Sequence, residues 1–226
     1  MTGDAGPSGP RRLVILGPQG AGKGTQGSRL AKRLGIPAVS TGDIFRANVG
    51  GDTELGRTAR TYMDAGELVP DEVTVAMVRD RLQQPDAADG FLLDGFPRNQ
   101  AQARSLSQIL HELGTGLDAV VELTLSDQQI IDRLTGRRVD TRTGRVWHIQ
   151  TDPPPDTDVA AGHVVQRDDD QPGPIARRLD IFREQTAPLI GFYREAGLLV
   201  SVDGDGSVEG VADQITDALA RAAVHT

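Results

Sequence analysis

The chain has 226 residues, of which 38% are hydrophobic and 25% are charged, and its formal net charge is −8. That composition is typical of a globular domain, and so acidic a chain is a poor candidate for a broad nucleic-acid surface. The chain has no cysteine, which excludes disulfides and cysteine-based zinc sites. No apolar run approaches the ~20 residues that span a bilayer. We therefore expect a cytoplasmic protein without nucleic-acid or membrane partners, preceded by a flexible tail over residues 1–10.

The first element is a short apolar run, Leu13–Leu16, that predicts a buried parallel strand. It leads into a glycine-rich loop, Gly17–Gly22, and then into a helical pattern. Such a loop can turn its backbone N–H groups toward an anion, and Lys23 can reach the phosphates of a nucleotide. The strict pattern has a hydroxyl residue directly after the lysine, but Gly24 stands there and Thr25 follows. We expect a magnesium ion to be held largely through water and Thr25.

Strands and helices alternate along the rest of the chain. Further strands are predicted at 36–39, 91–93, 119–123 and 198–202. Helices are predicted around 44–49, 55–66, 73–84, 100–113, 127–135, 174–195 (bent near Pro188) and from about Ser207 onward. This alternation predicts an α/β fold, a parallel sheet of about five strands with helices on both faces. Ligands bind such sheets beyond the carboxyl ends of the strands, where Lys23, Asp43 and Asp94 fall.

Two segments interrupt this alternation. Residues 40–69 indicate a small helical insert, in which Ser40–Asp43 supply hydroxyl and carboxylate groups suited to capping a helix. From residue 136 to about 166 the helical period fails, around Pro153–Pro155, and only 145–149 alternates like a strand of a hairpin. An irregular segment of this length inside a domain is usually functional or disordered.

Charged residues indicate phosphoryl transfer. Asp94 ends an apolar strand, the position from which a carboxylate can serve magnesium or its water. Arginines suit phosphate oxygens because the guanidinium grips two at a time. The acidic run Asp168–Asp170 is expected to pair with arginines and to hinge a moving segment. The histidines lack metal spacing, and His148 is interpreted as a structural contact. The candidate arginines lie near loop ends: Arg46, Arg98, Arg133, Arg137, Arg138, Arg167, Arg177 and Arg178, of which only one of the last two can face the site.

Taken together, these segments resemble adenylate kinases, of the nucleoside monophosphate kinase family. The resemblance covers nearly the whole chain from Arg12. It rests on Gly17–Thr25, Ser40–Arg46, Asp64–Val69, Gly90–Arg98, Gly136–Arg138, Arg167–Asp170, Arg177–Leu179 and Thr186–Ile190. In that family the Gly24–Thr25 ending is normal.

The resemblance implies the P-loop type of sheet and a reversible reaction in which ATP and AMP give two ADP with Mg²⁺. It implies a core (11–39, 70–135 and 169–226), an insert that binds the nucleoside monophosphate (40–69) and a closing lid (136–168). The large moving parts favour a monomer. Gln102 is the residue expected to recognise the AMP base, because its amide offers both a donor and an acceptor.

The resemblance also implies a set of site residues. ATP is expected on Gly20, Ala21, Gly22, Lys23, Gly24, Thr25, Arg137, Val146, Trp147 and Gly206. AMP is expected on Thr41, Arg46, Glu67, Leu68, Val69, Gly95, Phe96, Pro97, Arg98, Gln102, Arg167 and Arg178. The catalytic residues are expected to be Lys23, Arg98, Arg137, Arg167 and Arg178, and Mg²⁺ is expected on Thr25 and Asp94, through water.

The lid departs from the family pattern in two ways. Trp147 stands where the family often has tyrosine, which keeps an aromatic surface but loses the hydroxyl. Some relatives hold a zinc ion on four lid cysteines, and this chain has none. We expect Asp140, Thr143 and other polar lid residues to supply hydrogen bonds in its place.

Three alternatives stay open beside this interpretation. Within the family, the acceptor could be UMP or CMP, or the donor GTP, although the long lid and Gln102 favour ATP and AMP. A GTPase-like switch would need a guanine-reading Asn-Lys-x-Asp segment, which the sequence lacks. A regulatory module could bind nucleotide without turnover.

Overall fold

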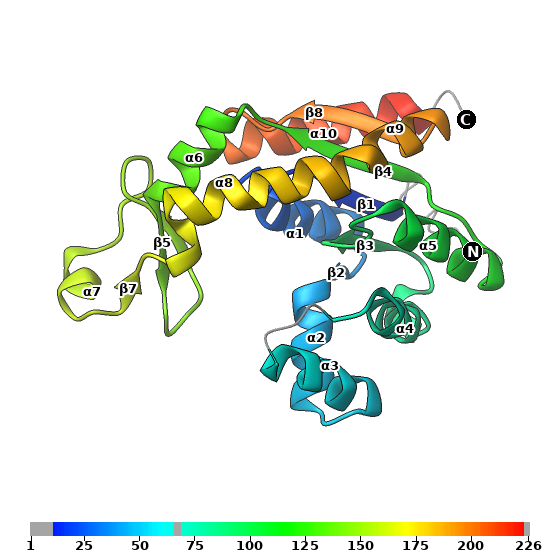
Figure 1. The fold of residues 1–226 in the computed structure, drawn as a ribbon. Coiled ribbons are helices and arrows are strands. Elements are labelled where there is room, and N and C mark those ends of the chain that lie inside the picture. Colours follow the sequence, from blue (N-terminus) through cyan, green and yellow to red (C-terminus); the bar gives the residue numbers. More distant parts are fainter. Residues whose placement is uncertain (1–10, 66–68, 224–226) are drawn as a thin grey trace, which may run out of the picture.

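The central sheet has five parallel strands in the order β2-β3-β1-β4-β8 (Figure 1). The computed structural model describes residues 11–65 and 69–223, so the predicted tail and the predicted helix end at Gly66 lie outside the described residues. The strands are β1 (Arg12–Leu16), β2 (Ala38–Ser40), β3 (Phe91–Asp94), β4 (Ala119–Thr124) and β8 (Leu199–Asp203). The predicted α/β fold with about five parallel strands is therefore confirmed.

The sequence predicts that the second strand begins at Ile36, but in the structure it begins at Ala38. The backbone N–H of Ile36 donates to the carbonyl oxygen of Ala31, at 3.0 Å, and so belongs to the end of the preceding helix. Pro37 has no N–H to give a sheet, although its carbonyl accepts from Leu92 at 2.9 Å. An apolar pattern alone does not reveal this competition for the backbone.

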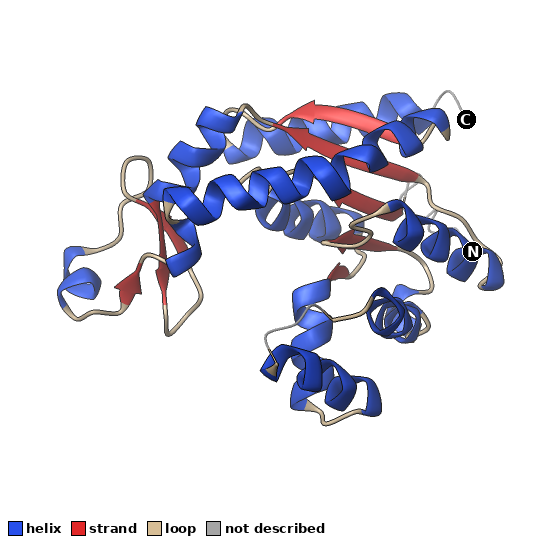
Figure 2. Cartoon of the chain, viewed as in Figure 1, coloured by secondary structure: helices blue, strands red, loops and turns tan. Residues whose placement is uncertain are grey.

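Helices cover both faces of the sheet because successive strand residues point to opposite sides (Figure 2). On one face Val14 and Leu16 pack in a core with three helices and with buried residues of the helical insert; on the other Leu13 and Ile15 pack with two more helices. The first set is α4 (Asp71–Leu82), α5 (Gln100–Glu112) and α9 (Ala187–Glu195), and the second is α1 (Lys23–Leu34) and α10 (Val208–Ala223). None of the helices in the described ranges is both long and apolar enough to cross a bilayer.

A helical insert follows the edge strand β2. It contains α2 (Thr41–Gly50) and α3 (Glu54–Asp64), which Figure 1 shows below the sheet beside α4. The hydroxyl of Ser40 accepts a hydrogen bond from the backbone N–H of Asp43 at 3.3 Å, so the predicted cap of α2 is confirmed. This cap starts the insert directly at the carboxyl end of β2.

The segment predicted as irregular is instead a small antiparallel sheet, reached through α6 (Asp127–Gly136). Its order is β6-β5-β7. The predicted hairpin strand at 145–149 is confirmed as β6, which pairs antiparallel with β5, whereas the third strand and a short helix were not predicted. The elements are β5 (Arg137–Asp140), β6 (Val146–His148), the short helix α7 (Asp156–Ala160) and β7 (Val164–Val165). Strands of two to four residues and a helix of five are too short to give a readable period.

A continuous helical stretch connects this small sheet back to the core. It contains α8 (Pro172–Ile181), a π-turn over Phe182–Thr186 and then α9. The backbone N–H of Ala187 bonds to the carbonyl of Phe182, five residues back, one turn before the irregularity predicted at Pro188. The helix starts at Pro172 rather than near 174, because proline is well suited to a first helical turn.

Tyr193→Phe is expected to raise the free energy of unfolding by about 1 kcal/mol, because a buried donor without a partner destabilises the folded state. Tyr193 is 2% exposed, burial raises the pKa of its phenol, and its hydroxyl has no hydrogen-bond partner among the described residues. Urea unfolding would measure the change, with Tyr62→Phe on α3 as the control. A destabilised Tyr193→Phe protein would show that the hydroxyl has a partner after all.

Candidate active site

The glycine-rich loop lies at the carboxyl end of β1, the middle strand of the sheet, and leads into α1. Gly17 and Gly20 have φ of 143° and 90°. A Cβ on Gly17 would lie 2.6 Å from the carbonyl oxygen of Leu123, and one on Gly20 would lie 2.9 Å from the side chain of Leu134. A loop this close to its neighbours therefore requires glycine at both positions.

The loop leaves the first turn of α1 open to an anion. Gly22 precedes the helix and has no side chain that could cap it, so the N–H groups of the first turn have no partner within the helix. Ala21 is buried in the core below, while Gly24 and Thr25 are exposed on that first turn. Such a helix start binds phosphate well, because its dipole and its free donors both favour negative charge.

Lys23, Asp94 and Arg98 interact electrostatically at the ends of β1 and β3. Burial lowers the pKa of Lys23, an effect that Asp94 opposes and Arg98 reinforces. Burial likewise raises the pKa of Asp94, while Lys23 and Arg98 act to lower it. The ammonium of Lys23 donates to the carbonyl of Pro18 at 2.9 Å, within its own loop. Incoming phosphate oxygens could replace that carbonyl as the acceptor.

Asp94 has the chemistry of a magnesium ligand. Its carboxylate accepts no hydrogen bond from the described residues, and a Cβ on Gly24 would lie 3.8 Å from its Oδ2 atom, so it faces the start of α1. Across 11–65 and 69–223 no three histidine, cysteine, aspartate or glutamate side chains group as metal ligands. Magnesium suits this arrangement, since it commonly takes one or two carboxylates plus water and substrate phosphates.

The loop after β3 brings together three of the residues predicted to bind AMP. Arg98 donates through Nε to the carbonyl of Gly95 at 2.9 Å and through Nη2 to the hydroxyl of Thr41 at 3.4 Å. A Cβ on Gly95 would lie 2.7 Å from that hydroxyl. The hydroxyl of Thr186, from the π-turn, donates to the carbonyl of Arg98 at 3.1 Å. Phe96 has its side chain fully buried in the core, so only its backbone, and that of Pro97 after it, can serve a ligand.

Gln102 has both ends of its amide engaged. Its oxygen accepts from the backbone N–H of Arg98 at 2.8 Å, and its nitrogen donates to Asp71 at 2.6 Å. Sequence reasoning missed Asp71, because an acidic residue in the first turn of a helix is ordinary. A glutamine and an acidic residue on different helices offer no signal that they meet.

Other residues predicted to bind AMP lie on or beside the helical insert. Arg46 is exposed on α2 and forms an ion pair with Asp43. Val69 is half-buried against the core. The predicted residues Glu67 and Leu68 lie outside the described residues.

Two of the predicted catalytic arginines are ion-paired with the acidic run. Arg137 donates through Nε to Asp170 at 2.8 Å, and Asp170 is fully buried. Arg178 bonds to Asp169, while Arg177 points outward and is exposed. Burial acts to raise the pKa of Asp169, but the hydrogen bond from Arg178 and the nearby arginine charges outweigh it and lower that pKa. The predicted pairing is therefore present, and a hinge at these residues stays a prediction.

The other candidate arginines make local contacts. Arg167 is exposed beside Asp169. Arg133 donates to the carbonyl of Gly204 at 2.9 Å, and Arg138 donates to the carbonyl of Thr135 at 3.0 Å. Gly206 follows β8 in the left-handed region, with φ of 114°. Arg133 therefore ties α6 to the loop that carries Gly206.

We call residues 136–168 the lid. Polar residues hydrogen-bond to one another within it, as predicted for a lid without zinc cysteines. Asp140 is 4% exposed and accepts from the backbone N–H groups of Arg142 and Thr143, at 2.8 and 3.2 Å. The guanidinium of Arg142 donates to Asp140 at 3.0 Å and to Asp158 at 2.7 Å. The hydrogen bond from Arg142, helped by those backbone donors, holds the pKa of Asp140 well below its usual range.

Asp140→Asn is expected to speed amide hydrogen exchange several-fold across residues 137–165 at pH 7 and to leave the core sheet unchanged. Because the pKa of Asp140 is lowered, its stabilising effect is complete above the ordinary value of about 3.9 and is lost as pH falls below it. Asp152→Asn is the control, because Asp152 is exposed and its ion pair with Arg145 is long, at 3.8 Å. Equal exchange in both variants would contradict a structural role for Asp140.

The aromatic residue of the lid lies on β6. The guanidinium of Arg145 lies over the ring of Trp147, 3.5 Å from its centroid, and Val146 is 52% exposed. His148 accepts from the backbone N–H groups of Gln150 and Thr151, at 3.3 and 3.4 Å, which fits its predicted structural role. Figure 1 shows this small sheet at one end of the molecule, connected to the core through α6 and α8.

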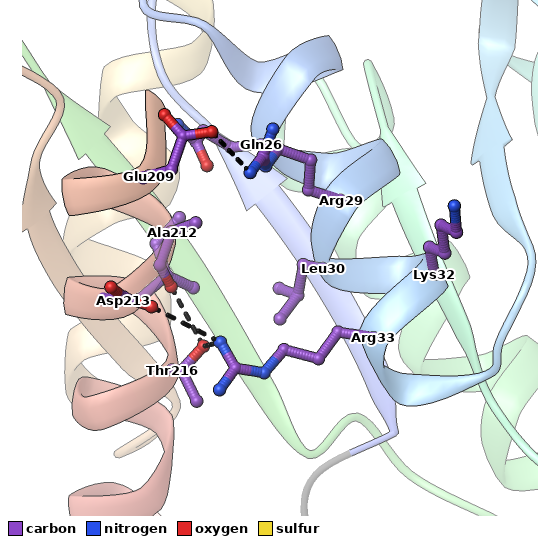
Figure 3. A pocket seen from close by; sticks show the side chains of 10 residues that line it. Gln26, Arg29, Leu30, Lys32, Arg33, Glu209, Ala212, Asp213 and Thr216 are labelled. Carbon is purple, nitrogen blue, oxygen red and sulfur yellow. Dashed lines mark hydrogen bonds and ion pairs between the residues drawn. The ribbon is translucent and has the colours of Figure 1, made fainter. Parts of the chain in front are cut away.

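A groove lies elsewhere, between α1 and α10, and has a volume of about 610 Å³ (Figure 3). Ion pairs cross it between Arg29 and Glu209 at 2.9 Å and between Arg33 and Asp213 at 3.6 Å, and Arg33 also donates to the hydroxyl of Thr216 at 3.1 Å. It contains none of the predicted site residues. We therefore interpret this groove as a structural contact between two helices, distinct from the predicted nucleotide site.

Comparison with known proteins gives one family. A family model described as adenylate kinase matches residues 15–198. A protein of Streptomyces avermitilis named adenylate kinase is 50% identical over 214 residues, which is 93% of this chain and 97% of that protein. Proteins of Salinispora tropica and Acidothermus cellulolyticus with the same name are 52% and 51% identical over 211 residues, 92% of this chain and 97% of each. The glycine loop, the Arg98 loop and these matches lead to one conclusion, that the chain belongs to the adenylate kinase family.

Proposed function

We propose that the protein transfers the γ-phosphoryl group of ATP to AMP, reversibly and with magnesium, to give two ADP. The observation that carries this proposal is the meeting of Lys23, Asp94 and Arg98 at one edge of the sheet, next to Thr41. A donor cradle and an acceptor loop that share this edge would place two phosphate chains end to end. The name of the relatives, adenylate kinase, agrees with this reaction.

The donor would lie on Gly20–Thr25, with its phosphates on the first turn of α1 and on Lys23. Thr25 and Asp94 would hold Mg²⁺, in part through water, and the ion would neutralise charge on the phosphates. Arg137, Val146, Trp147 and Gly206 would come to the nucleotide when the lid closes. In this structure Arg137 is engaged with Asp170 instead.

The acceptor would lie between the insert and the loop after β3. Arg98 and Arg46 would hold the phosphate of AMP, and Thr41 and Gly95 would shape the pocket between them. Gln102 would contact the base, and the segment from Glu67 to Val69 would cover it. Sequence signals for this pocket are spread over separate segments, which only the fold brings together.

Charge compensation is the main task of the protein in phosphoryl transfer, because little covalent chemistry falls to the enzyme. Lys23 and Arg98 both lie near Asp94, whereas Arg178 is bonded to Asp169 and Arg167 is exposed. Closure of the lid and the insert would bring these arginines to the moving phosphoryl group and exclude water that would otherwise accept it. We propose that the core, insert and lid move as the sequence predicts, within a monomer.

A nucleotide screen tests the proposed function. The purified protein is given ATP or GTP with Mg²⁺ and each of AMP, UMP, CMP and GMP, and the diphosphates formed are separated and quantified. We expect ATP with AMP to give the highest kcat/KM and the reverse reaction to proceed from ADP. Higher turnover with UMP or CMP would show that one of these, and not AMP, is the preferred phosphoryl acceptor. Nucleotide binding without formation of any ADP would overturn the proposal.

A further inference from the structure

The contact between Asp71 and Gln102 joins two helices that belong to different parts of the molecule. Asp71 lies in the first turn of α4, at the junction of the insert and the core, and Gln102 lies in the first turn of α5. Oδ1 of Asp71 accepts from Nε2 of Gln102 at 2.6 Å, and Oδ2 accepts from Nδ2 of Asn99 at 2.8 Å. Both oxygens of this carboxylate thus accept from amide donors at the start of α5, one on its N-cap residue Asn99 and one on Gln102.

We propose that Asp71 is a positioning residue that fixes the orientation of the Gln102 amide and thereby makes the acceptor site select adenine. The proposal rests on the proposed function, in which Gln102 contacts the base of AMP. Gln102 is 4% exposed, so its amide groups have few alternative partners in solvent. A buried amide whose neighbours fix its orientation can distinguish bases by donor and acceptor pattern.

The neighbours of the amide allow one orientation only. An ionised carboxylate accepts hydrogen bonds, and a backbone N–H donates them. The amide nitrogen of Gln102 faces Asp71 and its oxygen faces the N–H of Arg98. A rotation of 180° would set oxygen against oxygen at Asp71 and N–H against N–H at Arg98. Asp71 therefore opposes the flipped amide by charge as well as by loss of a hydrogen bond.

The fixed amide retains one acceptor and one donor for a ligand. A primary amide has two N–H donors and two oxygen lone pairs, and the two contacts use one of each. Adenine carries an amino donor at N6 and an acceptor at N1, which a fixed amide can match. Hypoxanthine and guanine carry an acceptor at O6 and a donor at N1, and would require the opposite order. The base with reversed pattern would leave buried polar groups unpaired.

The test compares AMP with IMP, because IMP reverses the hydrogen-bonding edge without adding a bulky group. In Asp71→Asn the new amide can present either oxygen or N–H to Gln102, so residue 71 no longer opposes the flipped amide and only the backbone N–H of Arg98 does. We expect the ratio of kcat/KM for AMP to that for IMP to fall about 10-fold. The change should lie mainly in KM for AMP, with KM for ATP unchanged.

Two controls separate positioning from a general structural effect. Glu72→Gln removes the same charge from the next residue of α4, an exposed position, and should leave the ratio unchanged. In a Gln102→Ala background, Asp71→Asn should no longer change the ratio, because the two effects share one side chain. If Asp71→Asn fails to fold, Asp71→Ser, whose hydroxyl can donate or accept, takes its place.

An unchanged ratio in folded Asp71→Asn would overturn the inference, and so would an equal fall in the Gln102→Ala background. A wild-type protein that uses IMP as well as AMP would also overturn it. These results differ from failure of the proposed function, in which wild-type protein forms no ADP from ATP and AMP.

Discussion

Lys23→Ala is expected to lower kcat/KM for ATP and AMP at least ~100-fold, the size of effect seen when one preorganised charge partner of a transition state is lost. The ammonium of Lys23 lies at the end of the glycine loop and donates to the carbonyl of Pro18 at 2.9 Å. It lies within the field of Asp94 and Arg98. Because its charge would follow the phosphoryl group during transfer, most of the loss should appear in kcat.

The measurement is initial-rate kinetics with each substrate varied in turn. Lys32→Ala is the matched control, since Lys32 is exposed on the same helix and Figure 3 shows it pointing away from the groove beside it. Thermal unfolding of both variants would check that the fold survives. Turnover of Lys23→Ala near that of the wild type would remove Lys23 from the proposed mechanism.

Arg98→Ala is expected to reduce kcat/KM by ~100-fold or more, because a guanidinium that grips two phosphate oxygens is lost. Arg98 is held by Gly95 and Thr41 through its side chain, and by Gln102 and Thr186 through its backbone. The backbone contacts survive the substitution, so the loop should keep its shape. Arg98→Lys should recover only part of the activity, since lysine keeps the charge but not the planar fork.

Arg104→Ala provides the comparison for Arg98, because Arg104 is an exposed arginine on α5. Its kinetics should match those of the wild type. If Arg98→Ala retained nearly full kcat/KM for AMP, the acceptor would have to bind elsewhere than beside Thr41 and Gly95.

The parallel sheet could be predicted from the sequence because its strands are short apolar runs separated by long helical patterns. A strand that is buried on both faces has a continuous apolar sequence, which is easy to recognise. Val14 and Leu13 accordingly pack in the cores on opposite faces of the sheet. The lid could not be predicted in the same way. Its strands depend on backbone pairing and on the Asp140–Arg142 contacts rather than on a hydrophobic period.

The candidate site follows the same distinction. Lys23 and Asp94 could be placed because each follows directly from a predicted strand, and parallel strands end at one edge. The sequence predicts that the acidic run pairs with arginines, but it does not tell which aspartate pairs with which arginine. In the structure Arg137 pairs with Asp170 and Arg178 with Asp169. Asp71 could not be found, because its contact with Gln102 depends on how α4 meets α5.

The π-turn at Phe182–Thr186 lies between α8 and α9. Each residue of an α-helix advances the chain by about 100° around its axis, and a π-turn accommodates one residue more than an α-turn. Because the extra residue is contained within that turn, deleting a single residue there would give a uniform α-helix and leave the direction of Arg178 relative to Leu189 nearly unchanged. Deleting one residue from the regular part of α8 after Arg178, or from α9 before Leu189, would instead rotate Arg178 away from Asp169 by roughly 100°. The π-turn is thus the one place in this helical stretch where the chain can lose a residue without rotating its charged face.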